Sequence, residues 1–206
     1  MQRLELAGVS TAKLQRTGAG KAMSYGEGIM GVSDTMRNCQ RSAAAAATAV
    51  QGTTGGQNID VALMMADGTR KGRADPAYDA HELPIGQWAA AVWHEWMPRL
   101  ALMKLVETAT VTLVEAARPW ARVHGPAAAF VMTCARLDWK VTDAVNIVTD
   151  QGMCLNLLKD PPAFIHERCR EAVRRWRWRR VQKSMPQLLL NGTSQGAVME
   201  PIWALL

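Results

Sequence analysis

The sequence lacks any hydrophobic run long enough to cross a membrane. Its longest apolar stretches, around residues 43–50 and 127–131, are short and rich in alanine, whereas a transmembrane helix needs roughly 18 or more consecutive apolar residues. Residues 1–5 contain no hydrophobic signal core, so export is not expected. These absences exclude a membrane-spanning segment and favour an intracellular protein, nuclear or cytoplasmic.

Paired cysteines are also missing, which excludes the common zinc and disulfide frameworks. The four cysteines, Cys39, Cys134, Cys154 and Cys169, form no CxxC pair and show no zinc-ligand spacing. Each has apolar neighbours, where a free cysteine behaves as a small hydrophobic side chain. This usage agrees with a reducing compartment.

No complete catalytic motif is present. Residues 18–21, Gly-Ala-Gly-Lys, lack both the earlier glycine and the following hydroxyl residue of a phosphate-binding loop. None of the histidines completes an HExxH motif, and Asp75 is better explained as a helix cap than as a metal ligand paired with Asp79. We therefore expect no catalytic residue, metal or cofactor. Enzyme activity would require His81, His94 and these two aspartates to converge in one pocket.

What the sequence does contain is helix signals along most of its length. Ser33 is placed to cap a helix that continues to about residue 51, and a short apolar helix follows at 59–66. A proline in the first helical turn loses no needed hydrogen bond and has the right φ angle. The prolines therefore predict further helices near Pro76, from Pro84 to Trp96, from Pro98 to Ala117 and from Pro126 to about Leu137.

One segment departs from the helical pattern. Residues 144–149 and 153–158 alternate in polarity around a short turn, in which Gly152 stands where a positive φ angle is needed. We therefore expect a mainly α fold, made of helical domains with one small β-hairpin near residues 144–158.

The polar, basic and glycine-bearing stretch at 68–74 is the best candidate for a linker. It would separate a helical segment at 1–67 from a helical domain at 75–185 that includes the hairpin. The remaining residues, 186–206, are expected to form a loosely ordered tail.

Charge is distributed very unevenly. Residues 164–183 contain eight basic and two acidic residues, a net charge of +6 that equals the net charge of the whole chain. Asp160 and the prolines at 161 and 162 predict the start of a helix that includes this segment as far as Lys183. The candidate polyanion-binding residues are Arg168, Arg170, Arg174, Arg175, Arg177, Trp178, Arg179, Arg180 and Lys183.

Helical spacing separates an apolar side of this segment from a basic side. Ile165, Cys169, Val173 and Trp176 share a face that is expected to be buried, whereas Trp178 is expected to be exposed. Arginine presents a planar fork to phosphate oxygens, and an exposed indole suits base stacking. We therefore expect contact with RNA, DNA or their hybrid. The alternatives are an acidic protein, an anionic membrane, a merely solvated helix, or arginines paired with acids elsewhere in the chain.

Two parts of the chain resemble the region downstream of the polymerase core in non-LTR (LINE-type) retrotransposon reverse transcriptases. The first comprises residues 12–16 (AKLQR), 22–27 (AMSYGE) and 37–41 (RNCQR), where a helix leads to a Tyr-Gly segment and a second helix with a basic pair. The second extends from residues 75–78 (DPAY) through Trp88, Trp93 and Trp96 to residues 173–180 (VRRWRWRR) and is similar to the region after the thumb.

The polymerase signature, an aromatic residue followed one position later by two aspartates, is absent, because the chain contains no Asp-Asp pair. The resemblance therefore implies the thumb-and-connection portion of a larger polyprotein, an RNA-directed DNA polymerase whose catalytic palm lies elsewhere. No catalytic residue carries over. The expected function is non-catalytic gripping of a template or primer backbone, and the alternative is a helical scaffold module that docks an acidic partner.

Overall fold

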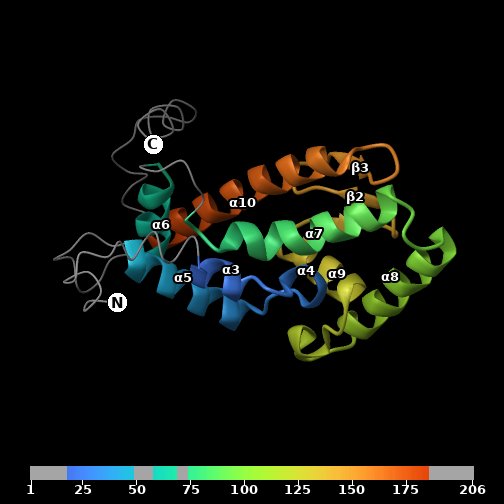
Figure 1. Cartoon of the computed structure of the whole chain (residues 1–206), viewed down its shortest axis with the longest axis horizontal. Helices are drawn as coiled ribbons and strands as arrows, with labels where there is room; N and C mark the ends of the chain where they lie inside the picture. Colours follow the sequence, from blue (N-terminus) through green and yellow to red (C-terminus); the bar gives the residue numbers. More distant parts are fainter. Residues whose placement is uncertain (1–17, 49–57, 69–73, 186–206) are drawn as a thin grey trace. The chain divides into compact units, whose positions relative to one another are not determined.

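The computed structural model describes residues 18–48, 58–68 and 74–185 (Figure 1). Within these residues the fold is mainly α with a small antiparallel sheet, which confirms the expected fold class. None of the helices in these segments combines the length and hydrophobicity that a bilayer crossing needs. The expected tail at 186–206 and most of the expected linker at 68–74 lie outside the described residues.

The chain divides into two compact units, each assembled from separated segments. The first unit contains residues 1–23, 38–76 and 175–206, and the second contains 24–37 and 77–174. Two helices, α5 (Asp34–Thr48) and α10 (Pro162–Ser184), contribute residues to both units. This grouping differs from the division along the sequence that was expected at 68–74, because segments distant in the sequence are packed together.

The second unit is built around helix α7 (Ala77–Trp93), which packs against α4 (Glu27–Met30) and α9 (Pro126–Arg136) (Figure 1). Helix α9 also packs against α8 (Arg99–Val114) and the 3-10 helix η2 (Pro119–Arg122). At its centre Trp88 stacks on Phe130 with ring centroids 5.2 Å apart. The indole nitrogen of Trp88 donates a hydrogen bond of 2.9 Å to the carbonyl oxygen of Ala144, so this buried polar group is satisfied.

Several local signals predicted the helix starts correctly. Helix α5 begins after Ser33, whose Oγ accepts a hydrogen bond of 3.3 Å from the backbone N–H of Met36. Helix α8 follows Pro98, α9 begins at Pro126, and α10 begins at Pro162. The short apolar helix is α6 (Ile59–Gly68). These starts depend on chemistry within a few residues of each helix end, which a sequence displays directly.

Helix α7 corrects the expectation that Pro84 begins a helix. It continues unbroken from Ala77 to Trp93 and contains Pro84 in its interior. An interior proline removes a backbone hydrogen bond and costs about 3 kcal/mol or more. Most of α7 is buried, including Pro84, Ile85 and Trp88. We infer that this burial stabilises the helix enough to offset the proline.

The sheet confirms the expected hairpin and adds a third strand, β1 (Lys140–Val141), that was not predicted. It has the order β1-β2-β3, with β2 at Asn146–Val148 and β3 at Cys154–Asn156, all antiparallel. Ile147 and Leu155 are register partners, and both are buried. The turn between β2 and β3 places Gly152 at a φ of 78°, a conformation that favours glycine.

Side chains of α7 and α10 meet within the second unit. A Cβ atom added to Gly86 would lie 2.2 Å from Cε1 of His166, so a larger residue at this position would require the ring to move. One turn away, Glu82 receives Arg170, whose Nε lies 3.1 Å from the Glu82 Oε1. A side-chain contact and an ion pair therefore hold the first half of α10 against α7.

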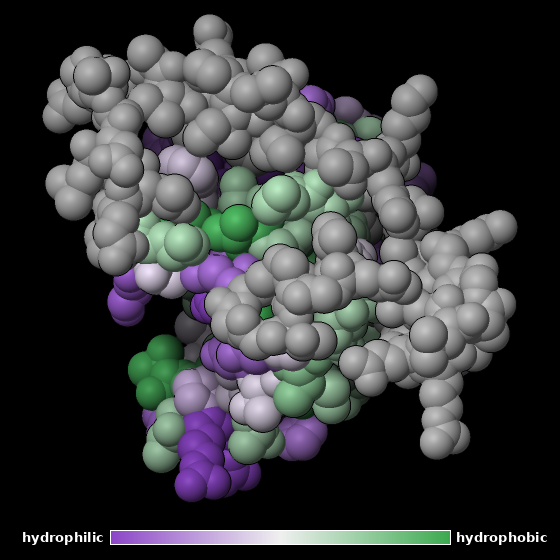
Figure 2. Space-filling model, turned by 90° about the vertical axis from the view of Figure 1, so that its left-hand side faces the viewer, coloured by the Kyte–Doolittle hydropathy of each residue, from purple (hydrophilic) through white to green (hydrophobic). Residues whose placement is uncertain are grey.

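Hydrophobic side chains also reach the surface, as Figure 2 shows on one face, where hydrophilic and hydrophobic residues lie next to one another. Helix α8 also has apolar side chains at the surface, including Leu100 and Val114, each 81% exposed. The first unit contains a small apolar cluster among its described residues, formed by Ala44, Ala45 and Leu63. Charged side chains, Arg41, Asp60, Asp75 and Arg177, are buried beside these apolar residues.

Candidate nucleic-acid interface

The apolar stripe expected on α10 is confirmed in the second unit. Ile165, Cys169 and Val173 are each 0% exposed. Burial of such side chains stabilises the helix against its unit by about 1.5–3 kcal/mol each. Trp176, expected to continue this stripe, is only partly buried. In the next turns, which belong to the first unit, the buried side of α10 is formed by Arg177 and Val181.

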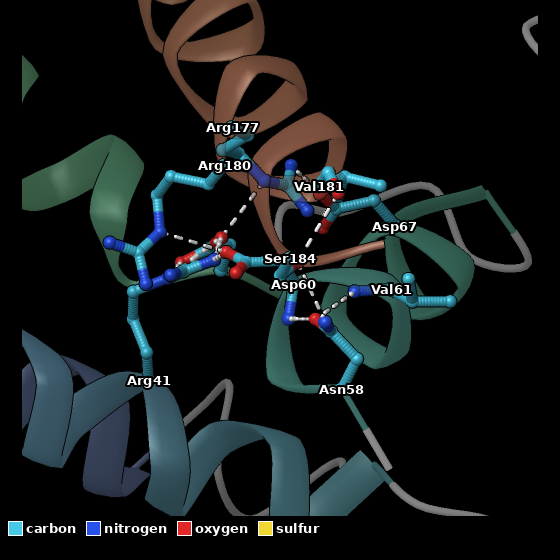
Figure 3. Close-up of polar contacts among 10 residues, drawn as sticks. Arg41, Asn58, Asp60, Val61, Asp67, Arg177, Arg180, Val181 and Ser184 are labelled. Carbon is cyan, nitrogen blue, oxygen red and sulfur yellow. Dashed lines mark hydrogen bonds and ion pairs between the residues drawn. The ribbon is translucent and has the colours of Figure 1, made fainter. Parts of the chain in front are cut away.

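Arg177, one of the candidate polyanion-binding residues, is buried rather than open to a partner. It is 2% exposed, and its Nε lies 2.9 Å from Oδ2 of Asp75. It also forms an ion pair with Asp67, on helix α6 (Figure 3). A buried arginine requires such partners, because an unpaired buried charge costs several kcal/mol.

Arg41, on α5, connects the remaining members of this network. Its Nε and Nη2 donate hydrogen bonds of 2.9 Å to the two carboxylate oxygens of Asp75, the two-point geometry that suits a guanidinium. Its Nη2 also lies 2.7 Å from Oδ1 of Asp60. Arg180 donates from Nε to the same Asp60 oxygen at 3.1 Å (Figure 3). We call this set of three arginines and three aspartates the Arg–Asp network: Arg41, Arg177, Arg180, Asp60, Asp67 and Asp75.

Burial and pairing act in opposite directions on the groups of the Arg–Asp network. Burial lowers the pKa of Arg41. The carboxylates of Asp75 and Asp60 together raise it by more than burial lowers it, so the pKa of Arg41 lies above its ordinary value. For Asp67 burial is the larger effect and raises the pKa, against the lowering by Arg177 and by the backbone N–H of Ala74. The charge of Arg41 is therefore favoured by its partners, whereas burial disfavours the charge of Asp67.

Trp176 lies against two guanidinium groups of the Arg–Asp network. The Cζ atoms of Arg41 and Arg180 lie 5.3 Å and 5.1 Å from the centre of its ring, within the range of cation–π attraction. This contact accounts for its partial burial: the indole packs on charged groups rather than on an apolar core.

Two other arginines of the predicted set also have acidic partners. Arg170 pairs with Glu82, although its side chain remains 40% exposed. Arg168 pairs with Glu171 at 2.9 Å, and its Cζ lies 5.2 Å from the centre of the Phe164 ring. The alternative in which arginines pair with acids elsewhere in the chain is thus correct for Arg170, Arg177 and Arg180, whereas Arg168 pairs within its own helix.

The rest of the predicted set lies on the outward side of α10. Arg174, Arg179 and Lys183 are exposed, whereas Arg175 is partly buried. Trp178 is partly buried rather than exposed as expected. Residues at i, i+4 and i+8 share one side of a helix, so Arg175, Arg179 and Lys183 form a basic row. We call Arg174, Arg175, Trp178, Arg179 and Lys183 the outward basic face.

The candidate catalytic residues occupy separate surroundings. His81 is 0% exposed with its Nδ1 against the carbonyl oxygen of Ala77, and the ring of His94 stacks on Trp96. Asp75 is enclosed by two arginines. Among the residues that the structure describes, no group of three or more His, Cys, Asp or Glu side chains could hold a metal ion.

Sequence reasoning missed Asp60 and Asp67 as partners of the basic helix. They stand seven positions apart on α6, and therefore lie on the same side of it two turns apart. An acidic pair with this spacing on an otherwise apolar helix is a usable signal for buried arginine partners. The ion pair of Arg177 with Asp67, however, connects positions 110 residues apart, and no local pattern identifies which arginine is used.

The fold and this arrangement define a mainly α protein in which helix α10 has arginines paired with aspartates on one side and solvent-exposed cations on the other. Comparison with protein-family models, with curated proteins and with solved structures finds no match to this chain.

Proposed function

We propose that this chain binds nucleic acid without catalysing a reaction, and that the outward basic face of α10 contacts the phosphate backbone. In this proposal the chain is the thumb-and-connection portion of a retrotransposon reverse transcriptase, which grips template or primer while a palm elsewhere performs the chemistry. The resemblance of residues 12–41 and 75–180 to that region supports the assignment.

The observation that carries the proposal is the separation of charges on α10. Between Ala172 and Ser184 the helix contains no acidic residue. The cations that turn inward, Arg177 and Arg180, are matched by aspartates of the Arg–Asp network. The outward basic face has exposed cations at Arg174, Arg179 and Lys183.

A row of this kind suits a polyanion whose charges repeat at regular spacing. Each phosphate that a cation neutralises releases a condensed counterion, so a few such contacts give affinity that falls steeply with salt. Backbone contacts contain no sequence information, which agrees with a gripping role. Trp178, partly buried between the arginines, is placed to support a stacked base or sugar at the edge of the face.

The test replaces Arg174, Arg179 and Lys183 together by glutamine. This variant keeps Arg177 and Arg180, so the Arg–Asp network stays intact. The matched control replaces Arg118, Lys140 and Lys159, which are exposed elsewhere, and removes the same charge. Binding to a fluorescent single strand and to an RNA–DNA hybrid is measured by anisotropy. We expect at least a tenfold loss of affinity in the first variant and less than a threefold loss in the control.

Equal losses in the two variants would mean that net charge, not this face, attracts the nucleic acid. If wild-type protein binds neither probe but captures an acidic protein after nuclease treatment, the scaffold alternative replaces the proposal.

A further inference from the structure

Helix α8 carries apolar side chains on two opposite sides. On its buried side, Leu102, Val106 and Leu113 are at most 6% exposed. On the other side Leu100 and Val114 are each 81% exposed, and Val111 is 54% exposed. A helix that is apolar on both sides is normally covered on both.

The exposed side follows the spacing of a coiled-coil seam. Leu100, Lys104, Glu107, Val111 and Val114 are separated alternately by four and three positions, and all are exposed. Met97, just before the helix and 42% exposed, continues the spacing. This alternation is the a/d repeat by which one helix packs along another. We call these six residues the α8 seam.

We propose that the α8 seam binds the α8 seam of a second copy of this chain, with the two helices antiparallel about a two-fold axis. An antiparallel pairing places each a position opposite a d position. Leu100 then lies opposite Val111 of the second copy, and Met97 lies opposite Val114 of the second copy. In the middle Lys104 lies opposite Glu107 of the second copy. The two-fold axis generates each of these pairs a second time, with the two copies exchanged.

The central charges decide both the partner and the direction. In a parallel pair Lys104 would meet Lys104 and Glu107 would meet Glu107, and like charges directly opposed are unfavourable. The antiparallel pair converts both repulsions into attractions and encloses them between apolar layers. A two-fold axis requires a surface that is complementary to itself, and this order of residues meets that condition. Among the described residues neither Lys104 nor Glu107 has an ion-pair partner that would compete.

The size of the α8 seam sets the expected strength. Helix α8 has 16 residues and therefore extends over about 24 Å, at about 1.5 Å per residue. A contact along one helix of this length is smaller than a typical obligate interface. Charged residues at seam positions set register at a cost in stability. We therefore expect a reversible dimer with a dissociation constant on the order of 10 μM.

The proposed dimer can be tested by reversing the charges of Lys104 and Glu107. Lys104→Glu places two glutamates at the centre of each helix, and Glu107→Lys places two lysines there. Each variant alone should stay monomeric at concentrations where the wild type dimerises, with at least a tenfold weaker self-association. An equimolar mixture should form heterodimers, because every central layer then pairs glutamate with lysine. The double variant K104E/E107K should dimerise as the wild type does.

Sedimentation velocity over a range of concentrations measures these associations without any nucleic acid. Lys159→Glu, an exposed position outside the α8 seam, serves as the control and should dimerise normally. Heterodimer formation also shows that both single variants are folded. A wild type that stays monomeric up to about tenfold above the expected dissociation constant overturns the proposal. So does a dimer that K104E leaves unchanged, or a mixture that fails to associate.

Discussion

The inward and outward sides of the last turns of α10 use the same residue type for different purposes. Inward, Arg177 and Arg180 are bound to Asp67, Asp75 and Asp60 of the Arg–Asp network. Outward, Arg174 and Arg179 are exposed. Arg177 acts as part of the interior of the first unit, whereas the side chain of Arg180 pairs with Asp60 but remains 40% exposed. The total charge of a helix therefore overstates the charge that a partner can meet.

The two sides should also respond differently to substitution. Breaking a buried ion pair leaves an uncompensated charge, which costs far more than removing a solvated one. Inward changes should reduce the free energy of unfolding, and outward changes should reduce affinity for nucleic acid.

The largest effect on stability is expected at Asp75. Asp75→Asn keeps the shape of the side chain but removes the charge that holds Arg41 and Arg177. We expect a loss of about 3–5 kcal/mol in the free energy of unfolding, the usual cost of breaking a buried pair. Urea denaturation monitored by tryptophan fluorescence measures it. A loss below about 1 kcal/mol would show that the inward arginines do not depend on this carboxylate.

An intermediate effect on stability is expected at Gly86 of α7, where the contact with α10 depends on shape rather than on charge. Gly86→Ala forces a methyl group against the ring of His166. Such overpacking costs about 1–3 kcal/mol. His166→Ala should restore most of that stability in the double variant, and a double-mutant cycle by thermal denaturation measures the coupling. Additive effects would contradict the close approach.

A smaller effect is expected at Asp67, whose loss leaves Arg177 with Asp75. We expect Asp67→Asn to cost about 1 kcal/mol, the value of one hydrogen bond at neutral pH. Because burial raises the pKa of Asp67, the folded state binds this proton more tightly than the unfolded state. Relative to the variant, the wild type should therefore lose stability as the pH rises from the ordinary pKa of 3.8 through the raised value. A wild-type advantage that instead grows over this range would contradict the direction of the shift.

Features that depend on residues close together in the sequence could be predicted, and features that depend on distant residues could not. The starts of α5, α9 and α10 and the turn at Gly152 depend on residues within a few positions, and they were predictable. The unbroken path of α7 through Pro84 depends on burial from several sides.

The same holds for the charges of the candidate site. The basic residues of α10 lie within one segment of the sequence, so its charge could be predicted. The pairing of Arg180 with Asp60, however, connects residues 120 positions apart. Which arginines turn inward is decided by those distant aspartates, so the outward basic face could be separated from the inward arginines only in three dimensions.

The salt dependence of nucleic-acid binding tests the role of the outward basic face most directly. The slope of log affinity against log salt concentration changes by roughly 0.7–0.9 for each phosphate that the protein no longer neutralises. Replacing Arg174, Arg179 and Lys183 by glutamine should therefore make the slope shallower by roughly 2–3 while the unfolding free energy changes by less than about 0.5 kcal/mol. An unchanged slope in a stably folded variant would contradict the assignment of the outward basic face.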